Sequence, residues 1–261
     1  MGCWALGGQW GPVSEAQGIA TVHAAIEAGV NLFDTADSYG PRRSEEILGR
    51  ALAGGQRPHV FIATKVGNLS RPDGHSFGYT SPEHIYACCD ASLHRMQTDY
   101  IDLYQCHIRE HPHHEIFLEA FERLLEAGKI RAYGTSSFIV SEIELFDRHG
   151  RCQVVQLPYS VLERTHEAAA LPFCGEHNIG VLVRGPMAQG VLSGKYGPDD
   201  RFDDPTRSGW NSGAGRKSFQ AKVAAAEALR PLVNETRSMA QLALAFSVAH
   251  PATTCAIPGA R

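Results

Sequence analysis

Short apolar runs alternate with longer amphipathic stretches along the whole chain. The apolar runs are nearly continuous in hydrophobicity and rich in β-branched and aromatic residues, as expected for strands buried on both faces of a sheet. They lie at residues 30–34, 60–65, 100–106, 131–136, 153–157, 181–185 and 254–257. The pattern therefore predicts seven short strands.

The stretches between these runs have apolar residues at helical spacing. They predict helices over residues 15–28, 44–52, 84–96, 115–127, 141–148, 166–177, 219–233 and 237–249. Ser81 and Pro82 are expected to cap and open the third helix, and Asn178 to end the sixth in the left-handed conformation. The alternation of the two element types is typical of repeated βα units, and hence of a parallel sheet.

Seven strands at this spacing predict a (β/α)₈ TIM barrel in one domain, residues 1–261, with most of its first strand missing. The alternative is an open doubly wound sheet, which requires a glycine-rich fingerprint directly after its first strand. The GGQWG segment at residues 7–11 lacks that G-x-G-x-x-G spacing. Residues 189–216 are too long for an ordinary barrel loop, and such loops at the carboxyl face are usually functional.

Composition narrows the class of protein further. The chain has 261 residues with 24 basic and 28 acidic side chains, a net charge of −4, so a nucleic-acid or membrane surface is not favoured. No apolar run reaches ~18 residues, and the first residues have neither the basic start nor the apolar core of a signal peptide. The seven cysteines contain no C-x-x-C pair, which favours reduced thiols in a cytoplasmic protein. The HPHH segment at residues 111–114 is interpreted as a polar loop, with no metal site expected.

Four polar residues fall near the carboxyl ends of three successive predicted strands. They are Asp34 and Tyr39, then Lys65, then His107. In a parallel barrel these strand ends open onto one mouth, so residues far apart in sequence are expected to meet.

These residue types suit the reduction of a carbonyl group. As a hydride arrives, negative charge grows on the carbonyl oxygen and an acid must supply a proton. A phenol with a pKa of about 10 is too weak an acid unless a neighbour stabilises its anion, as a nearby ammonium does. We therefore expect Tyr39 to be the acid, Lys65 its tuner, Asp34 the residue that orients Lys65, and His107 the carbonyl-binding group. Each residue alone also has an ordinary structural explanation, such as a helix cap or packing.

Several longer motifs make the chain recognisable. It resembles the aldo-keto reductase superfamily, particularly its bacterial and potassium-channel β-subunit-like branches. The resemblance is carried by GCWALGGQWG, AGVNLFDTADSYG, RSEEILGRAL, IATKVG, IDLYQCH, GKIRAYGTSSF, VVQLPYSVLER, GVLVRGPMAQGVLSGKY and CAIPGAR. It implies an NADPH-dependent reductase of aldehydes or ketones that binds NADP(H) in an extended pose without a Rossmann fold.

The resemblance also implies which residues hold the cofactor. Ser136 and Gln156 match positions that bind the nicotinamide carboxamide, and Ser137 stands where the family usually has Asn. Arg184 stands where many members stack an aromatic ring on the nicotinamide, with a rim salt bridge as its alternative role. The other implied cofactor residues are Trp4, Gln9, Gly185, Pro186, Met187, Ala188, Gly190, Lys195, Arg207 (with Arg201 as competitor), Gly259 and Arg261.

Family members carry more chain before GCW and after IPGAR. We therefore expect the sequence to lack most of strand one and the C-terminal helix, which would expose strand edges and weaken adenine binding. Two other functions stay open: an NADP(H)-binding redox-sensing module with little turnover, and a degenerate barrel without function. The substrate is expected to be a small carbonyl compound selected by Trp10 and by the loops at residues 68–79, 109–114 and 189–216.

Overall fold

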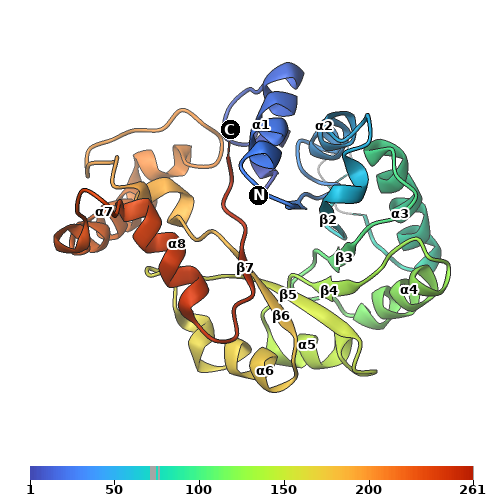
Figure 1. The fold of residues 1–261 in the computed structure, drawn as a ribbon. Coiled ribbons are helices and arrows are strands. Elements are labelled where there is room, and N and C mark those ends of the chain that lie inside the picture. Colours follow the sequence, from blue (N-terminus) through green and yellow to red (C-terminus); the bar gives the residue numbers. More distant parts are fainter. Residues whose placement is uncertain (71–74, 76, 261) are drawn as a thin grey trace. The chain divides into compact units, whose positions relative to one another are not determined.

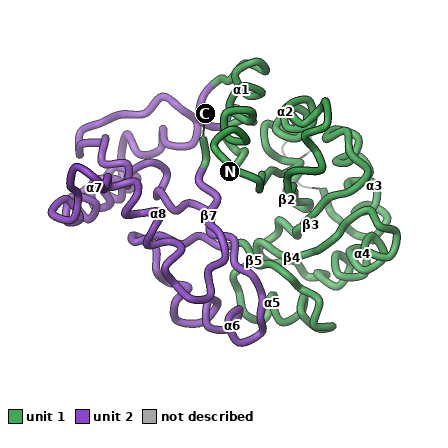
Figure 2. The backbone as a smooth tube through the Cα atoms, viewed as in Figure 1, with its two compact units in different colours: residues 1–8, 12–156, 259–261 green, residues 9–11, 157–258 purple. Residues whose placement is uncertain are grey.

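The computed structural model describes residues 1–70, 75 and 77–260, and the chain divides into two compact units (Figure 2). Unit 1 comprises residues 1–8, 12–156 and 259–261, and unit 2 comprises residues 9–11 and 157–258. The seven predicted strands are present, and their order in the sheet is that of the sequence. That the chain is one domain stays a prediction.

Unit 1 begins with a run of parallel strands that bring their carboxyl ends to one edge. The strands are β1 (Leu32–Asp34), β2 (Phe61–Val66), β3 (Leu103–Cys106), β4 (Tyr133–Thr135) and the larger part of β5 (Cys152–Pro158). Asp34 pairs with Ala63, and Lys65 pairs with Gln105. This register places the end of β1 two residues before Lys65 on the neighbouring strand.

Helices alternate with these strands as the sequence predicts. They are α1 (Glu15–Glu27), α2 (Arg43–Ala51), α3 (Pro82–Met96), α4 (His114–Glu126) and α5 (Val140–Phe146). Figure 1 shows α2, α3 and α4 along the outer side of the strands. Phe117, Phe121 and Tyr133 are fully buried between this helical layer and the sheet, where their rings pack edge to face or tilted.

Unit 2 contains β6 (Gly180–Arg184), β7 (Cys255–Ala256), α6 (Ala170–Glu176), α7 (Gly213–Glu227) and α8 (Met239–Ala249). It has its own apolar cluster, in which Phe202 and Phe219 from the long loop and α7 pack with Met239 of α8. A capping box between Ser238 and Gln241 satisfies backbone N–H groups at the start of α8. The residues at 189–216 are thus anchored by packing within this unit.

Three details of the predicted elements were wrong, and the long loop contains local turns that the pattern did not predict. The helix expected at residues 166–177 is divided by Ala169 into a 3₁₀ turn (Thr165–Ala168) and α6. The helix expected at 219–233 begins six residues earlier, at Gly213, and ends at Glu227. The long loop contains two 3₁₀ turns, Ala188–Ser193 and Ser208–Asn211. Ser81 forms no side-chain cap for α3.

Glycine explains the displaced start of α7. Glycine has a low helix propensity, so Gly213 and Gly215 hid the first turn from a pattern based on apolar spacing. Gly215 is required by packing, because a Cβ atom there would lie 2.0 Å from the carbonyl oxygen of Gly209. Asn178 adopts the left-handed conformation as predicted, with φ of 56°.

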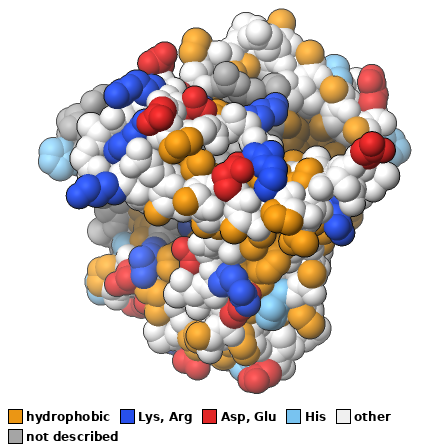
Figure 3. Space-filling model, turned by 90° about the vertical axis from the view of Figure 1, so that its left-hand side faces the viewer, with side chains coloured by type: hydrophobic (Ala, Val, Ile, Leu, Met, Phe, Trp, Pro, Cys, Tyr) orange, Lys and Arg blue, Asp and Glu red, His pale blue; other side chains and the backbone are white. Residues whose placement is uncertain are grey.

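On the face in Figure 3, basic and acidic side chains are interspersed with apolar ones. Among the described residues, no helix has the length and apolarity to span a bilayer, and no three potential metal ligands cluster. The seven cysteines are free thiols, and burial raises the pKa of Cys89 and Cys106 to about 12.

Candidate active site

Lys65 is the centre of the predicted site and is completely buried. Its ammonium nitrogen donates to Asp34 Oδ1 at 2.7 Å, to the Thr35 carbonyl oxygen at 2.7 Å and to Tyr39 Oη at 3.2 Å. An ammonium has three protons and no acceptor, so these partners use its whole hydrogen-bonding capacity. Lys65 therefore acts on its surroundings as a fixed positive charge beside a phenol.

The turn after β1 places Thr35 and Tyr39 beside the Lys65 ammonium, because its backbone is hydrogen-bonded to β2. Thr35 N–H donates to the Ala63 carbonyl at 2.8 Å, and Asp37 N–H donates to the Lys65 carbonyl at 3.4 Å. Tyr39 N–H then closes a tight turn onto the Ala36 carbonyl at 3.2 Å. These bonds bring the phenol ring of Tyr39 next to the Lys65 ammonium, whose nitrogen lies 4.9 Å from the ring centre.

Opposing effects determine the pKa of the Lys65 ammonium. Burial, the largest, lowers it, whereas the Asp34 carboxylate and the Tyr39 hydroxyl raise it through charge and hydrogen bonding. The balance raises the pKa above its ordinary value. The ammonium thus keeps its charge throughout the pH range in which proteins function.

Asp34 is shared between two partners. Its Oδ1 atom accepts from Lys65, and its Oδ2 atom accepts from the side-chain amide of Gln156 at 2.6 Å. An ionised carboxylate can only accept, so the Gln156 nitrogen must face it and the amide oxygen is left as an acceptor. Both side chains are almost wholly buried.

His107 and Trp4 flank the phenol of Tyr39. The His107 ring stands edge-on to Tyr39 with centroids 5.9 Å apart, and its Nδ1 atom lies 3.5 Å from Ser38 Oγ. The Trp4 ring is 36% exposed and lies 6.3 Å from the Tyr39 ring. Tyr39 and His107 are partly exposed, so the two groups proposed to contact substrate are also the accessible ones. The structure brings the four predicted residues together within unit 1.

The two predicted carboxamide-binding residues that follow β4 differ in accessibility. Ser137 is fully buried, donates to the Arg109 carbonyl at 2.7 Å and accepts from Ile139 N–H at 3.4 Å. Its hydroxyl thus organises the turn after β4. Ser136 is partly exposed, and its hydroxyl is the more accessible of the two.

The predicted cofactor residues of unit 2 form a loop with unusual backbone geometry. Gly185 and Gly190 have φ of 66° and 95°, and Ala188 also lies in the left-handed region. Pro186 is buried, and Met187 and Ala188 pack against the apolar cluster of this unit. Arg184 and Lys195 are exposed cations.

Arg207 is held within unit 2 by several partners. Its guanidinium pairs with Asp204 at 2.9 Å, donates to Tyr196 Oη at 2.8 Å and lies 5.0 Å from the Trp10 ring centre. Thr206 Oγ1 also donates to the Gln9 carbonyl at 2.6 Å, which ties this segment to residues 9–11. The competing Arg201 is exposed and donates to a backbone carbonyl.

The C-terminal residues of the predicted set belong to unit 1. Gly259 forms a parallel bridge with Gly2, and Arg261 lies outside the described residues, as do positions 71–74 and 76 of the predicted substrate loop. The Thr35 carbonyl and Ser38 were not foreseen as parts of the site, and the buried Asp37 was not foreseen as its neighbour. The DTADSYG segment contained all three, but a backbone carbonyl or a buried carboxyl leaves no separate signal in a sequence.

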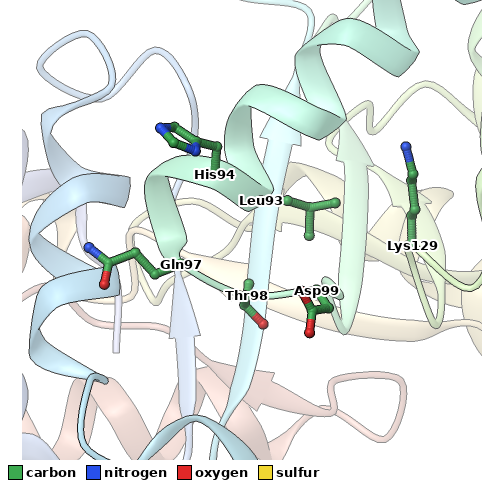
Figure 4. Close-up of a pocket in the computed structure, with 6 residues that line it drawn as sticks. All are labelled: Leu93, His94, Gln97, Thr98, Asp99 and Lys129. Carbon is green, nitrogen blue, oxygen red and sulfur yellow. The ribbon is translucent and has the colours of Figure 1, made fainter.

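A surface pocket of about 700 Å³ lies away from these residues. Leu93, His94, Gln97, Thr98, Asp99 and Lys129 line it, as Figure 4 shows. These residues precede β3 and β4, at the amino ends of the strands, whereas the site lies at the carboxyl ends. In barrels of this kind the amino face contributes to stability and the carboxyl face to catalysis.

The fold and the site together define a class of protein. It is a parallel βα protein with a cluster of acidic and basic side chains at the carboxyl ends of its strands. The profile of the Aldo/keto reductase family matches residues 1–261. The chain belongs to the aldo/keto reductase family, which confirms the resemblance inferred from its motifs. The likeness to solved members below also confirms the predicted fold class, a partial TIM barrel.

The chain matches most, but not all, of the length of individual relatives. Aldo-keto reductase YhdN of Bacillus subtilis is 33% identical over 267 residues, which is 100% of this chain and 80% of the relative. Glycerol dehydrogenase AKR11B4 from Gluconobacter oxydans is similar with a TM-score of 0.83 and 30% identity, covering 98% of this chain and 80% of that one. An aldo-keto reductase from Klebsiella pneumoniae in complex with NADPH has a TM-score of 0.72 and 27% identity, covering 100% and 79%.

Proposed function

We propose that the protein reduces an aldehyde or ketone to an alcohol with NADPH, and runs in reverse when the cofactor is oxidised. The observation that carries this proposal is the Lys65 ammonium, whose three protons go to Asp34, Thr35 and Tyr39. Bound NADPH would supply the hydride. The chain's own residues supply the proton and the orientation of the carbonyl group.

Tyr39 is proposed as the general acid. Loss of its proton creates a phenolate, and the ammonium 3.2 Å away stabilises that charge in a low-dielectric site. Lys65 cannot donate elsewhere, because its other two protons are held by Asp34 and Thr35. Asp34 in turn keeps the ammonium charged and aimed.

His107 is proposed to hold the substrate carbonyl next to Tyr39. Its Nδ1 atom lies 3.5 Å from Ser38 Oγ, and an imidazole N–H can donate to a carbonyl oxygen. The ring is proposed to donate this bond as a neutral imidazole. Two donors on one oxygen fix the direction from which the hydride must arrive.

The residues present fit a nicotinamide cofactor. Gln156 has a fixed amide oxygen that can accept from the carboxamide, and Ser136 adds a partly exposed hydroxyl in the same unit. In unit 2, Arg184 and Lys195 are exposed cations of the kind that bind a pyrophosphate or a 2′-phosphate, whereas Arg207 is paired with Asp204. The family relative solved with NADPH supports the same cofactor for this chain.

The proposed substrate is a small carbonyl compound. The family and the glycerol dehydrogenase relative both support small polar molecules, and Trp4 provides an exposed apolar wall next to Tyr39. No nucleic-acid or membrane partner is proposed.

The direct test mixes the purified chain with NADPH and a panel of reactive aldehydes and follows cofactor absorbance. The expected result is substrate-dependent oxidation of NADPH that Tyr39→Phe abolishes while NADPH binding, measured by fluorescence, persists. Tyr100→Phe is the control, because that ring lies between Arg57 and Arg131 and outside the site. A folded chain that binds NADPH tightly without turnover would refute the reductase and support the redox-sensing module.

A further inference from the structure

Asp37 is a buried carboxyl group that the proposed function does not use. The residue is 1% exposed, and neither carboxyl oxygen has a hydrogen-bond partner among the described residues. An ionised carboxylate in such a position is strongly disfavoured, because the nearby Ser38 amide replaces little of the water it has lost. The group is therefore poised to carry a proton.

The backbone of Asp37 connects it directly to Lys65 and to the turn that carries Tyr39. Its N–H donates to the Lys65 carbonyl at 3.4 Å, and its own carbonyl accepts from Arg42 N–H at 2.7 Å. Tyr39 follows two residues later in the same turn. Any charge that forms on Asp37 therefore arises within the segment that holds the phenol on the ammonium.

The groups that face Asp37 come from every element packed around it. Glu45 from α2 raises the pKa of the carboxyl, whereas Arg95 from α3, the Ser38 amide and Lys65 from β2 lower it. Glu45 and Arg95 are themselves paired at 2.6 Å, so their effects largely oppose one another. Burial, the largest cause, raises the pKa of Asp37 to about 7.

The remaining neighbours carry no compensating charge. Cys88 from α3, Tyr79 from the loop after β2 and Tyr104 from β3 interact electrostatically with Asp37. Burial raises the pKa of the Cys88 thiol to about 11 and raises the pKa of both phenols. All three are neutral near neutral pH, so Lys65 and Arg95 are the cations that sense a charge on Asp37.

We propose that Asp37 is a positioning residue whose protonation state governs proton transfer from Tyr39, acting through Lys65. The inference depends on the proposed reductase function. When Asp37 is neutral, the Lys65 ammonium is fully available to stabilise the Tyr39 phenolate. When Asp37 loses its proton to solvent, its negative charge offsets part of that field and opposes phenolate formation.

The direction of the effect follows from the charge balance of reduction. The O–H bond of Tyr39 breaks, its proton goes to the carbonyl oxygen, and a phenolate forms while the hydride from NADPH adds to the carbonyl carbon. Ionised Asp37 destabilises that phenolate. Reduction therefore slows as the pH rises through the range in which Asp37 ionises.

The test is the pH profile of kcat/KM for aldehyde reduction by the wild type and by Asp37→Asn. In the wild type we expect a fall on the order of fivefold centred near neutral pH, as for a unit charge at moderate range in a partly screened site. The variant should lack this inflection and keep the acidic-side rate of the wild type. The same inflection in both proteins would overturn the inference.

Glu45→Gln provides a second variant with an independent prediction. Removing the Glu45 charge removes one of the effects that raise the pKa of Asp37, so the inflection should move to lower pH. An unmoved inflection in this folded variant would count against Asp37 as its source. This arm keeps the test decisive if Asp37→Asn fails to fold.

An infrared titration separates this inference from the proposed function because it needs no turnover. The carbonyl stretch of a protonated carboxyl should be present at about pH 6, lost by about pH 8.5, and missing from Asp37→Asn. An active enzyme without an Asp37-dependent band refutes the inference alone. The band in a protein that reduces no carbonyl compound refutes the proposed function alone.

Discussion

Gln156 donates its side-chain amide to the one oxygen of Asp34 that Lys65 leaves open, at 2.6 Å. The two residues are 122 positions apart in the chain, and both are buried. Asp34 is thus clamped on both oxygens. The amide nitrogen of Gln156 binds Asp34, and its oxygen is proposed to accept from the cofactor. One side chain would therefore link the cofactor to Asp34, the residue that orients the Lys65 ammonium.

Replacing Gln156 by Leu should therefore weaken both the fold and the reaction. The change leaves Asp34 Oδ2 without its donor, which costs about 1–3 kcal/mol for a buried acceptor. Urea denaturation measures this loss, and NADPH titration should show weaker binding. Gln153→Leu is the matched control, since Gln153 lies on the same strand and is exposed. Equal stability of the two variants would contradict the clamp.

The sequence predicts a site made of Asp34, Lys65 and the partly exposed Tyr39 and His107 because this chemistry is rare at strand ends. A lysine at the end of a buried strand requires a partner, and Asp34 lies at the end of the preceding strand. Parallel pairing alone then brings them together. The alternation of strands and helices could also be predicted. A strand buried on both faces and a helix apolar on one face differ in the spacing of their apolar residues.

The parts that the sequence did not reveal depend on long-range or backbone geometry. The Gln156–Asp34 bond joins distant segments, and the Thr35 carbonyl that binds Lys65 belongs to the backbone, whose hydrogen bonding no residue type specifies. Asp37 was not singled out, because burial is a property of the folded chain. The start of α7 was missed because Gly215 is selected by close packing against Gly209.

Asp37 should also make stability depend on pH. Its pKa is raised from 3.8 to about 7 in the fold, so the folded chain binds this proton more tightly than the unfolded chain. This contribution is fully present below about pH 4 and is lost as the pH rises to about 7. Asp37→Asn should remove the loss and gain roughly 4 kcal/mol over the wild type near pH 8, less the cost of burying the amide.

Urea unfolding at about pH 5 and about pH 8 measures this difference. The gain of Asp37→Asn over the wild type should be larger at the higher pH. Asp99→Asn serves as the control, because Asp99 is exposed and its replacement should change stability little at either pH. A pH-independent difference between Asp37→Asn and the wild type would show that Asp37 is ionised in the fold throughout.

The capping box of α8 provides a test of unit 2 that is independent of catalysis. Ser238 Oγ accepts from Gln241 N–H at 3.2 Å, while the Gln241 side chain accepts from Ser238 N–H at 2.8 Å. Ser238→Ala should cost about 1 kcal/mol of stability. Ser212 precedes α7 without a side-chain cap bond, so Ser212→Ala should be nearly neutral. Similar losses in thermal unfolding for both variants would argue against the cap.

Lys65→Met is the severest test of the site because it removes a buried charge and leaves its partner. Asp34 then becomes an unpaired buried carboxylate, and breaking such a pair costs about 3–5 kcal/mol. Reduction should fall by about 10² or more, because Tyr39 loses the charge that stabilises its phenolate. Lys65→Met combined with Asp34→Leu should recover much of the stability, since the orphaned charge is gone, but none of the activity. Activity recovered together with stability in the double variant would show that the ammonium serves the fold and not the proton transfer.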